Sequence, residues 1–130
     1  MSVNTAVVID DDTIFVFGIK RLMSVLNFSH NIKVYGNGSE ALEAFKAGAS
    51  ADVIFLDLNM PVMDGWQFLE EYTQLQVTPK PIIYIVSSSI DPADIARAKE
   101  YDNVRDYVVK PVSKNRLREI MSDIADRKAT

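Results

Sequence analysis

Short runs of β-branched and aromatic residues alternate along the chain with segments in which apolar residues recur at helical spacing. The five runs typical of β-strands are 6–9, 32–35, 53–56, 82–86 and 107–109. Helical spacing is found over 15–26 and 68–75 and is clearest in Leu117, Ile120, Met121 and Ile124. Strict alternation of this kind predicts a parallel sheet with helices on both faces.

Capping residues indicate where three of the helices begin. Ser39 precedes an apolar segment, Asp91 is followed by Pro92, and Ser113 stands before the last helical stripe. The stripe over 91–101 consists mostly of alanine, so we expect this helix to be packed less firmly than the others.

The composition of the runs predicts their order in the sheet. The first, third and fourth are apolar on both faces, as central strands are. The second contains Lys33, and the fifth follows Arg105 and Asp106, as is typical of edge strands. A doubly wound sheet with the order 2-1-3-4-5 places the second and fifth strands at the edges. We therefore predict an α/β fold, a flavodoxin-like (βα)5 three-layer sandwich with this strand order.

Length, charge and composition restrict the class of protein. The 130 residues suit one domain, and the absence of cysteine excludes disulfides and thiolate sites and suits a cytoplasmic location. The apolar run at the N-terminus has no basic residue before it, so we expect no signal peptide. No stretch approaches the ~20 apolar residues of a membrane helix. The net charge of −4 disfavours nucleic acid, and we expect no membrane partner.

Polar residues gather at the carboxyl ends of the predicted strands. The acids Asp10, Asp11 and Asp12 follow the first strand, and Asp57 follows the third, so the predicted order brings them into one crevice. Several close carboxylates need a counter-charge, and ligands that are all oxygen favour a hard cation, Mg²⁺ or Mn²⁺. Across the crevice, the residues that suit phosphate oxygens are Ser87 and Lys110. Asp57, at the centre, is the best candidate for a nucleophile that forms an aspartyl-phosphate.

Four segments at these strand ends together resemble the receiver domain of two-component response regulators. They are Val8-Ile9-Asp10-Asp11-Asp12, Asp57-Leu58-Asn59-Met60-Pro61 with Met63-Asp64-Gly65, Ser87-Ser88, and Tyr107-Val108-Val109-Lys110-Pro111. Each segment alone has little specificity, but the four in this order are highly specific, and the resemblance covers nearly the whole chain. It implies a stand-alone response regulator, with 1–130 as a single receiver domain and no output domain.

The resemblance implies a phosphoacceptor and a metal site. Asp57 would take a phosphoryl group from a histidine kinase or a histidine phosphotransfer protein. Mg²⁺ would be held by Asp11, Asp57 and the backbone carbonyl of Asn59, with Asp10 acting through water. The protein would catalyse only its own phosphorylation and dephosphorylation, so we expect no enzyme acting on an external substrate.

The resemblance also implies a switch. Ser87 would hydrogen-bond the phosphoryl group, Ser88 would fill the small position beside it, Lys110 would pair with the phosphoryl group, and Tyr107 would turn inward as Ser87 moves. The bond between Lys110 and Pro111 would be cis. The face of the fourth helix, fifth strand and fifth helix would then control a downstream protein, from a monomer or a weak phosphorylation-dependent dimer. The fourth run has one more apolar residue than many receivers have, which leaves the register of the serines open by one position.

Two alternative functions remain to be distinguished from this one, and Asp12 is assigned a separate role. The segment 10–14 is superficially similar to the Asp-x-Asp-x-Thr signature of haloacid-dehalogenase-like phosphatases, in which Asp10 would be the nucleophile, but Thr13 comes one residue early. A pseudo-receiver that binds partners without phosphorylation would have no need to retain a cluster of like charges. We interpret Asp12 as a helix cap rather than as a ligand.

Overall fold

Strands and helices alternate strictly throughout residues 3–129, which are the residues that the computed structural model describes. In chain order the elements are β1 (Val3–Ile9), α1 (Thr13–Leu26), β2 (Ser29–Tyr35), α2 (Gly38–Lys46), β3 (Val53–Leu56), α3 (Gly65–Gln74), β4 (Ile82–Ser87), α4 (Pro92–Ala98), β5 (Val104–Val109) and α5 (Lys114–Ala129). The strands pair in parallel in the order β2-β1-β3-β4-β5. The predicted fold class and strand order are confirmed.

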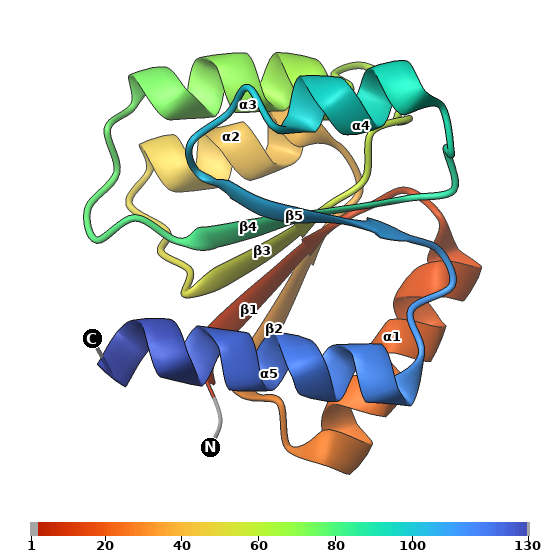
Figure 1. The fold of residues 1–130 in the computed structure, drawn as a ribbon. Helices are drawn as coiled ribbons and strands as arrows, with labels where there is room; N and C mark the ends of the chain where they lie inside the picture. Colours follow the sequence, from red (N-terminus) through yellow and green to blue (C-terminus); the bar gives the residue numbers. More distant parts are fainter. Residues whose placement is uncertain (1–2, 130) are drawn as a thin grey trace.

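The sheet separates two hydrophobic layers. Helices α1 and α5 cover one face, and α2, α3 and α4 cover the other (Figure 1). Successive strand residues point to opposite faces, so Phe55 belongs to the cluster beneath α1 and α5, while Ile54 and Leu56 belong to the other cluster. The α5 stripe is confirmed, because Leu117 and Ile120 are fully buried in the first cluster. This stacking leaves the carboxyl ends of the strands free to carry polar side chains.

The central strand β1 and the two edge strands are longer than the sequence predicts. β1 begins at Val3, β2 at Ser29 and β5 at Val104, each earlier than the apolar run that predicted it. Arg105 lies within β5 and pairs at 2.8 Å with Asp123 of α5. Polar residues within an edge strand interrupt the apolar run without interrupting the ladder of backbone hydrogen bonds.

The capping predictions hold for two helices and fail for one. The Asp91 side chain accepts a hydrogen bond from the α4 backbone, and the Ser113 hydroxyl accepts one at 3.0 Å from the first turn of α5. Ser39 was the wrong residue: α2 begins at Gly38 and is capped by Asn37. Asparagine and serine are equally good caps, so their order in the sequence does not decide which one is used.

Helix α4 is held to α3 largely by surface contacts. It buries only Ala98, in agreement with its weak apolar stripe. The Arg97 guanidinium lies 4.5 Å from the centre of the Trp66 ring, which stacks at 5.9 Å on Tyr101. Tyr101 in turn donates a 2.6 Å hydrogen bond to Glu70 of α3. A cation, two rings and a carboxylate therefore join the two helices where the apolar core does not.

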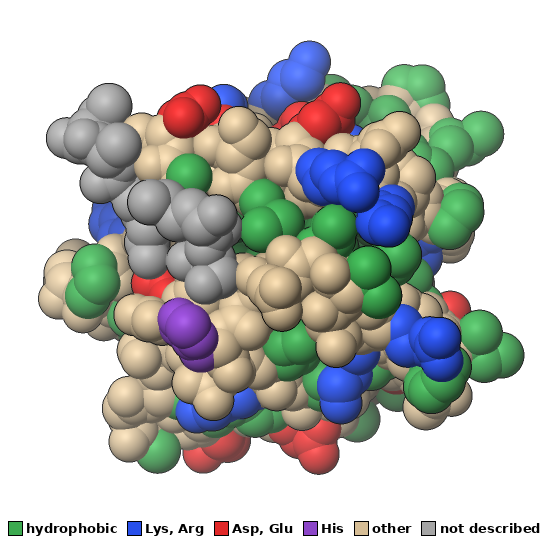
Figure 2. Space-filling view, turned by 90° about the horizontal axis from the view of Figure 1, so that it is seen from below, with side chains coloured by type: hydrophobic (Ala, Val, Ile, Leu, Met, Phe, Trp, Pro, Cys, Tyr) green, Lys and Arg blue, Asp and Glu red, His purple; other side chains and the backbone are tan. Residues whose placement is uncertain are grey.

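The outer side of α1 is apolar and basic. Ile14, Phe17 and Val25 are 84%, 65% and 62% exposed, and Lys20 and Arg21 are exposed beside them. Figure 2 looks onto the side of the molecule that carries α1 and α5, where basic side chains lie among hydrophobic ones. No helix in the described part of the chain combines the length and the apolar composition needed to cross a membrane.

Candidate functional site

Three aspartates meet where β1 and β3 end. One carboxylate oxygen from each of Asp10, Asp11 and Asp57 lies within 4.8 Å of the other two. The Asp57 amide donates to the Ile9 carbonyl at 2.9 Å, which holds the two strand ends together. Asp10 and Asp57 are only 3% and 5% exposed, whereas Asp11 faces solvent. The strand order thus brings these acids together, as the sequence predicts.

Asp12 stands apart from this cluster and caps α1. Its Oδ1 accepts hydrogen bonds from the Ile14 and Phe15 amides at 3.1 and 3.2 Å. The Asp12 amide donates at 2.9 Å to Oδ1 of Asp10. Asp12 is therefore a helix cap, as expected, and its backbone also orients one of the acids.

Lys110 provides the counter-charge. Its Nζ lies 2.9 Å from Oδ2 of Asp10 and 3.8 Å from Oδ1 of Asp57, and its side chain is only 13% exposed. The Lys110 amide donates at 2.8 Å to the Ser87 carbonyl, which anchors the lysine to the end of β4. The peptide bond between Lys110 and Pro111 is cis.

Burial makes the ionised carboxylates of Asp10 and Asp57 unfavourable. Burial, together with the charge of Asp10, raises the pKa of Asp57 to about 6, and the attraction of Lys110 only partly opposes this rise. Burial also raises the pKa of Asp10, against the hydrogen bond from the Asp12 amide and the charge of Lys110. The cluster holds three acids against one lysine, and all of its possible metal ligands are oxygen atoms. This set fits a hard divalent cation, which would supply the missing positive charge.

The serine run links the site to α4 and β5. Ser87 is fully buried at the end of β4, and its Oγ accepts a hydrogen bond from the Ser89 amide at 3.1 Å, while Ser88 is exposed. The Tyr107 hydroxyl donates to the Ser89 carbonyl at 2.9 Å. The Ser89 hydroxyl donates to Asp94 of α4 at 2.7 Å. A change at Ser87 can therefore reach α4 and Tyr107 through a single residue.

Gly65 packs closely against the backbone that carries Asp57, a role that the sequence did not reveal. It opens α3, and its amide donates to the Leu58 carbonyl at 2.9 Å. A Cβ atom there would lie 2.4 Å from the backbone oxygen of Asp57. The available signal was a glycine directly after Asp64, which caps the helix. Asn59, whose carbonyl the resemblance assigns to the metal, lies in the exposed part of the same loop.

Val62 in this loop adopts a backbone conformation that β-branched residues rarely tolerate. Its φ is 69°, and its side chain is 83% exposed, so packing does not offset the cost. We expect Val62→Asn to raise the free energy of unfolding by about 1 kcal/mol, because asparagine accepts the left-handed region more readily. Urea denaturation measures this. Val25→Asn, at an exposed position inside α1, should give no comparable gain in the free energy of unfolding. Equal gains in the two variants would contradict the backbone strain at Val62.

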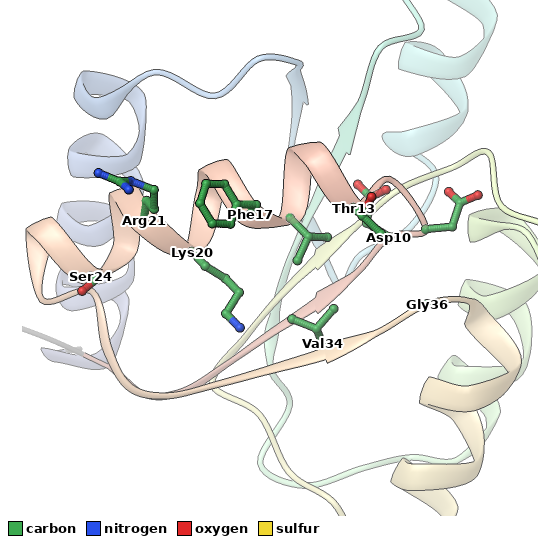
Figure 3. A pocket seen from close by; sticks show the side chains of 10 residues that line it. Asp10, Thr13, Phe17, Lys20, Arg21, Ser24, Val34 and Gly36 are labelled. Atoms are coloured by element: carbon green, nitrogen blue, oxygen red, sulfur yellow. The ribbon is translucent and has the colours of Figure 1, made fainter.

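A groove runs from the acids along α1. It has a volume of about 620 Å³ and lies between α1 and the edge strand β2. Asp10 and Asp11 line the end nearest the site, and Lys20 and Val34 point toward each other across the groove (Figure 3). No pattern in the sequence indicated this groove.

Comparisons with known proteins agree with this geometry. Residues 6–122 match the response regulator receiver domain family. An uncharacterized response regulatory protein of Vibrio vulnificus is 31% identical over 123 residues, which are 93% of this chain and 47% of that protein. A protein-glutamate methylesterase/protein-glutamine glutaminase of Agrobacterium fabrum is 33% identical over 85% of this chain and 31% of its own length. The chain thus spans less than half the length of these curated relatives.

Solved structures show the same architecture over nearly the whole chain. A two-component response regulator from Cytophaga hutchinsonii is 29% identical with a TM-score of 0.85, covering 97% of this chain and 99% of that one. A CheY-like receiver domain protein from Methanospirillum hungatei shares the fold, with a TM-score of 0.82 at 18% identity over 98% of both chains.

Proposed function

Because the chain belongs to the response regulator receiver domain family and is a two-component response regulator, we propose that Asp57 is its phosphoacceptor. The observation that carries this proposal is the place of Asp57: buried among the acids, with Lys110 Nζ 3.8 Å from its Oδ1. A carboxylate oxygen of Asp57 attacks the phosphorus of a phosphohistidine. The phosphorus–nitrogen bond breaks, and its electron pair goes to the imidazole nitrogen. The match to the receiver domain family favours this proposal over the haloacid-dehalogenase-like phosphatase alternative, in which Asp10 would be the nucleophile.

We propose that Mg²⁺ or Mn²⁺ would be held by Asp11, Asp57 and the backbone carbonyl of Asn59, with Asp10 acting through water. When bound, the cation neutralises negative charge on the phosphoryl oxygens. Lys110 neutralises charge from the other side of the crevice. Its ammonium lies 2.9 Å from Asp10 and 3.8 Å from Asp57, which is within reach of a phosphoryl group on Asp57. The protein in this proposal acts on no substrate besides its own phosphoryl group.

The proposed switch begins at Ser87. When Ser87 moves to donate its hydroxyl to a phosphoryl oxygen, the hydrogen bond that it accepts from the Ser89 amide breaks. The Ser89 carbonyl then loses the hydrogen bond from the Tyr107 hydroxyl, and Tyr107 turns inward. Ser88, next in the chain, leaves room beside the phosphoryl group. Movement of Tyr107 changes the hollow of about 320 Å³ that it lines between α4 and β5. The face of α4, β5 and α5 thereby changes shape for a downstream protein.

A histidine kinase or a histidine phosphotransfer protein is the proposed donor. The apolar and basic face of α1 and the groove beside it offer such a partner a surface that leads to Asp10 and Asp11. Several expectations stay predictions: a cytoplasmic location, a monomer or weak dimer, no nucleic-acid or membrane partner, and a single domain over 1–130 without an output domain.

Incubation with acetyl phosphate and MgCl₂, followed by intact-mass spectrometry, tests the proposal. We expect the wild type to gain the mass of one phosphoryl group, and Asp57→Asn or added EDTA to abolish the gain. Asp12→Asn, which removes a neighbouring acid outside the cluster, should be labelled like the wild type. A wild type that gains no mass would favour the pseudo-receiver, and label that persists in Asp57→Asn would move the phosphoacceptor elsewhere.

A further inference from the structure

The Phe15 ring lies against the ammonium group of Lys110. The Nζ atom is 4.4 Å from the centre of the ring. Phe15 is in the first turn of α1, where its amide donates to the Asp12 cap at 3.2 Å, and its side chain packs on the core cluster beneath α1 and α5. The ring therefore has a defined place on one side of the reactive lysine.

The ammonium has three neighbours of different kinds. Asp10 lies at 2.9 Å and Asp57 at 3.8 Å, and the aromatic face closes a further side. An aromatic face attracts a cation through its quadrupole but carries no net charge. A carboxylate in the place of Phe15 would add a fourth acid to the cluster and would compete for the N–H donors of Lys110. The ring attracts the ammonium and leaves those donors available for oxygen atoms of the site.

We propose that Phe15 is a positioning residue that holds the Lys110 ammonium within reach of the phosphoryl group on Asp57. This proposal rests on the proposed function, because only phosphoryl transfer to Asp57 requires the lysine there. Lys110 acts on charge that develops in the transition state. Loss of the ring should therefore lower the maximal rate constant of phosphorylation and leave the half-saturating concentration of acetyl phosphate nearly unchanged.

The contact itself is tested by NMR on the metal-free wild type. Protons above an aromatic face are shifted upfield by the ring current. We expect the Cε protons of Lys110 to resonate upfield of those of the exposed lysines Lys33 and Lys80, and Phe15→Leu to remove the difference. Lys110 protons at the ordinary position in the wild type would overturn the proposal without recourse to any variant.

The rate of phosphorylation tests the consequence of the contact. With acetyl phosphate and MgCl₂, Phe15→Leu should reduce the maximal rate constant about fivefold, and Phe15→Tyr, which keeps an aromatic face, should restore it. Phe45→Leu removes a buried ring from the opposite core cluster and should retain the wild-type rate. Equal rates for Phe15→Leu and the wild type would overturn this proposal alone. A wild type that takes no phosphoryl group would overturn the proposed function as well.

Discussion

Replacing Asp57 by asparagine is expected to raise the free energy of unfolding of the metal-free protein at pH 7 by about 2 to 3 kcal/mol. Burial and the charge of Asp10 raise the pKa of Asp57 from 3.8 to about 6, so at pH 7 the fold holds a carboxylate that would be better solvated in the unfolded chain. Asparagine has nearly the same shape and carries no charge, so this cost disappears.

The pH dependence of stability provides a second test of the destabilising effect of the Asp57 carboxylate. Between pH 3.8 and about 6, the folded protein binds more protons at Asp57 than the unfolded chain does. The stability of the wild type should therefore fall as the pH rises through this range, and the fall should be much smaller in Asp57→Asn. Millimolar Mg²⁺ at pH 7 should stabilise the wild type more than it stabilises this variant, because the ligand binds only the folded state.

Urea denaturation followed by circular dichroism, with EDTA or with Mg²⁺, measures these effects. Asp12→Asn is the matched control, since asparagine is an equally good helix cap and Asp12 is exposed. Its stability should differ from the wild type by no more than about 0.5 kcal/mol. An Asp57→Asn variant that is no more stable than the wild type at pH 7 would contradict the destabilisation that we attribute to the buried, ionised carboxylate of Asp57.

Gly65→Ala is expected to lower the free energy of unfolding by about 3 kcal/mol and to weaken Mg²⁺ binding with it. The new methyl group would lie 2.4 Å from the Asp57 backbone oxygen and 2.9 Å from the Leu58 Cα. Both are backbone atoms in the loop directly after β3, so rotation of a side chain cannot make room for the methyl group. The loop must move, and it carries Asp57 away from the other acids.

Gly18→Ala provides the contrast. Gly18 lies inside α1, and nothing stands within 4 Å of the Cβ that alanine would add. Alanine there should stabilise the protein by about 1 kcal/mol, because it is the better helix former. Thermal denaturation of both variants, with Mg²⁺ titrations for affinity, gives the comparison. Equal stabilities of the two variants would show that the backbone of Asp57 and Leu58 can accommodate a Cβ atom at position 65.

The sequence predicts the parts of this fold in which burial dictates residue type. The apolar runs of β1, β3 and β4 were recognised, whereas polar residues concealed how early β1, β2 and β5 begin. The meeting of Asp10 and Asp57 was predictable, because carboxyl ends of parallel strands share one edge of the sheet. These successes follow from periodicity and topology.

What the sequence could not predict depends on shape in three dimensions. Phe15 fits the apolar stripe of α1, and its contact with Lys110 appears only when the end of β5 lies beside that helix. The groove with Lys20 and Val34 depends on how α1 sits over an edge strand, for which no periodic pattern exists. Gly65 belongs to the segment that follows Asp57 in the receiver-like motif, but its role depends on the close approach of its Cα to the Asp57 backbone, which residue types alone do not reveal.

Trp66, which contacts the Arg97 guanidinium and the Tyr101 ring, is an intrinsic fluorescent probe of this protein. Trp66 is the single tryptophan of the chain, and the cation that covers it comes from α4. Indole emission depends on nearby charge and on exposure to water, so any shift of α4 away from α3 alters the fluorescence of the unmodified protein. The position of α4, the helix with the weakest packing on the core, can therefore be followed in solution without an added dye.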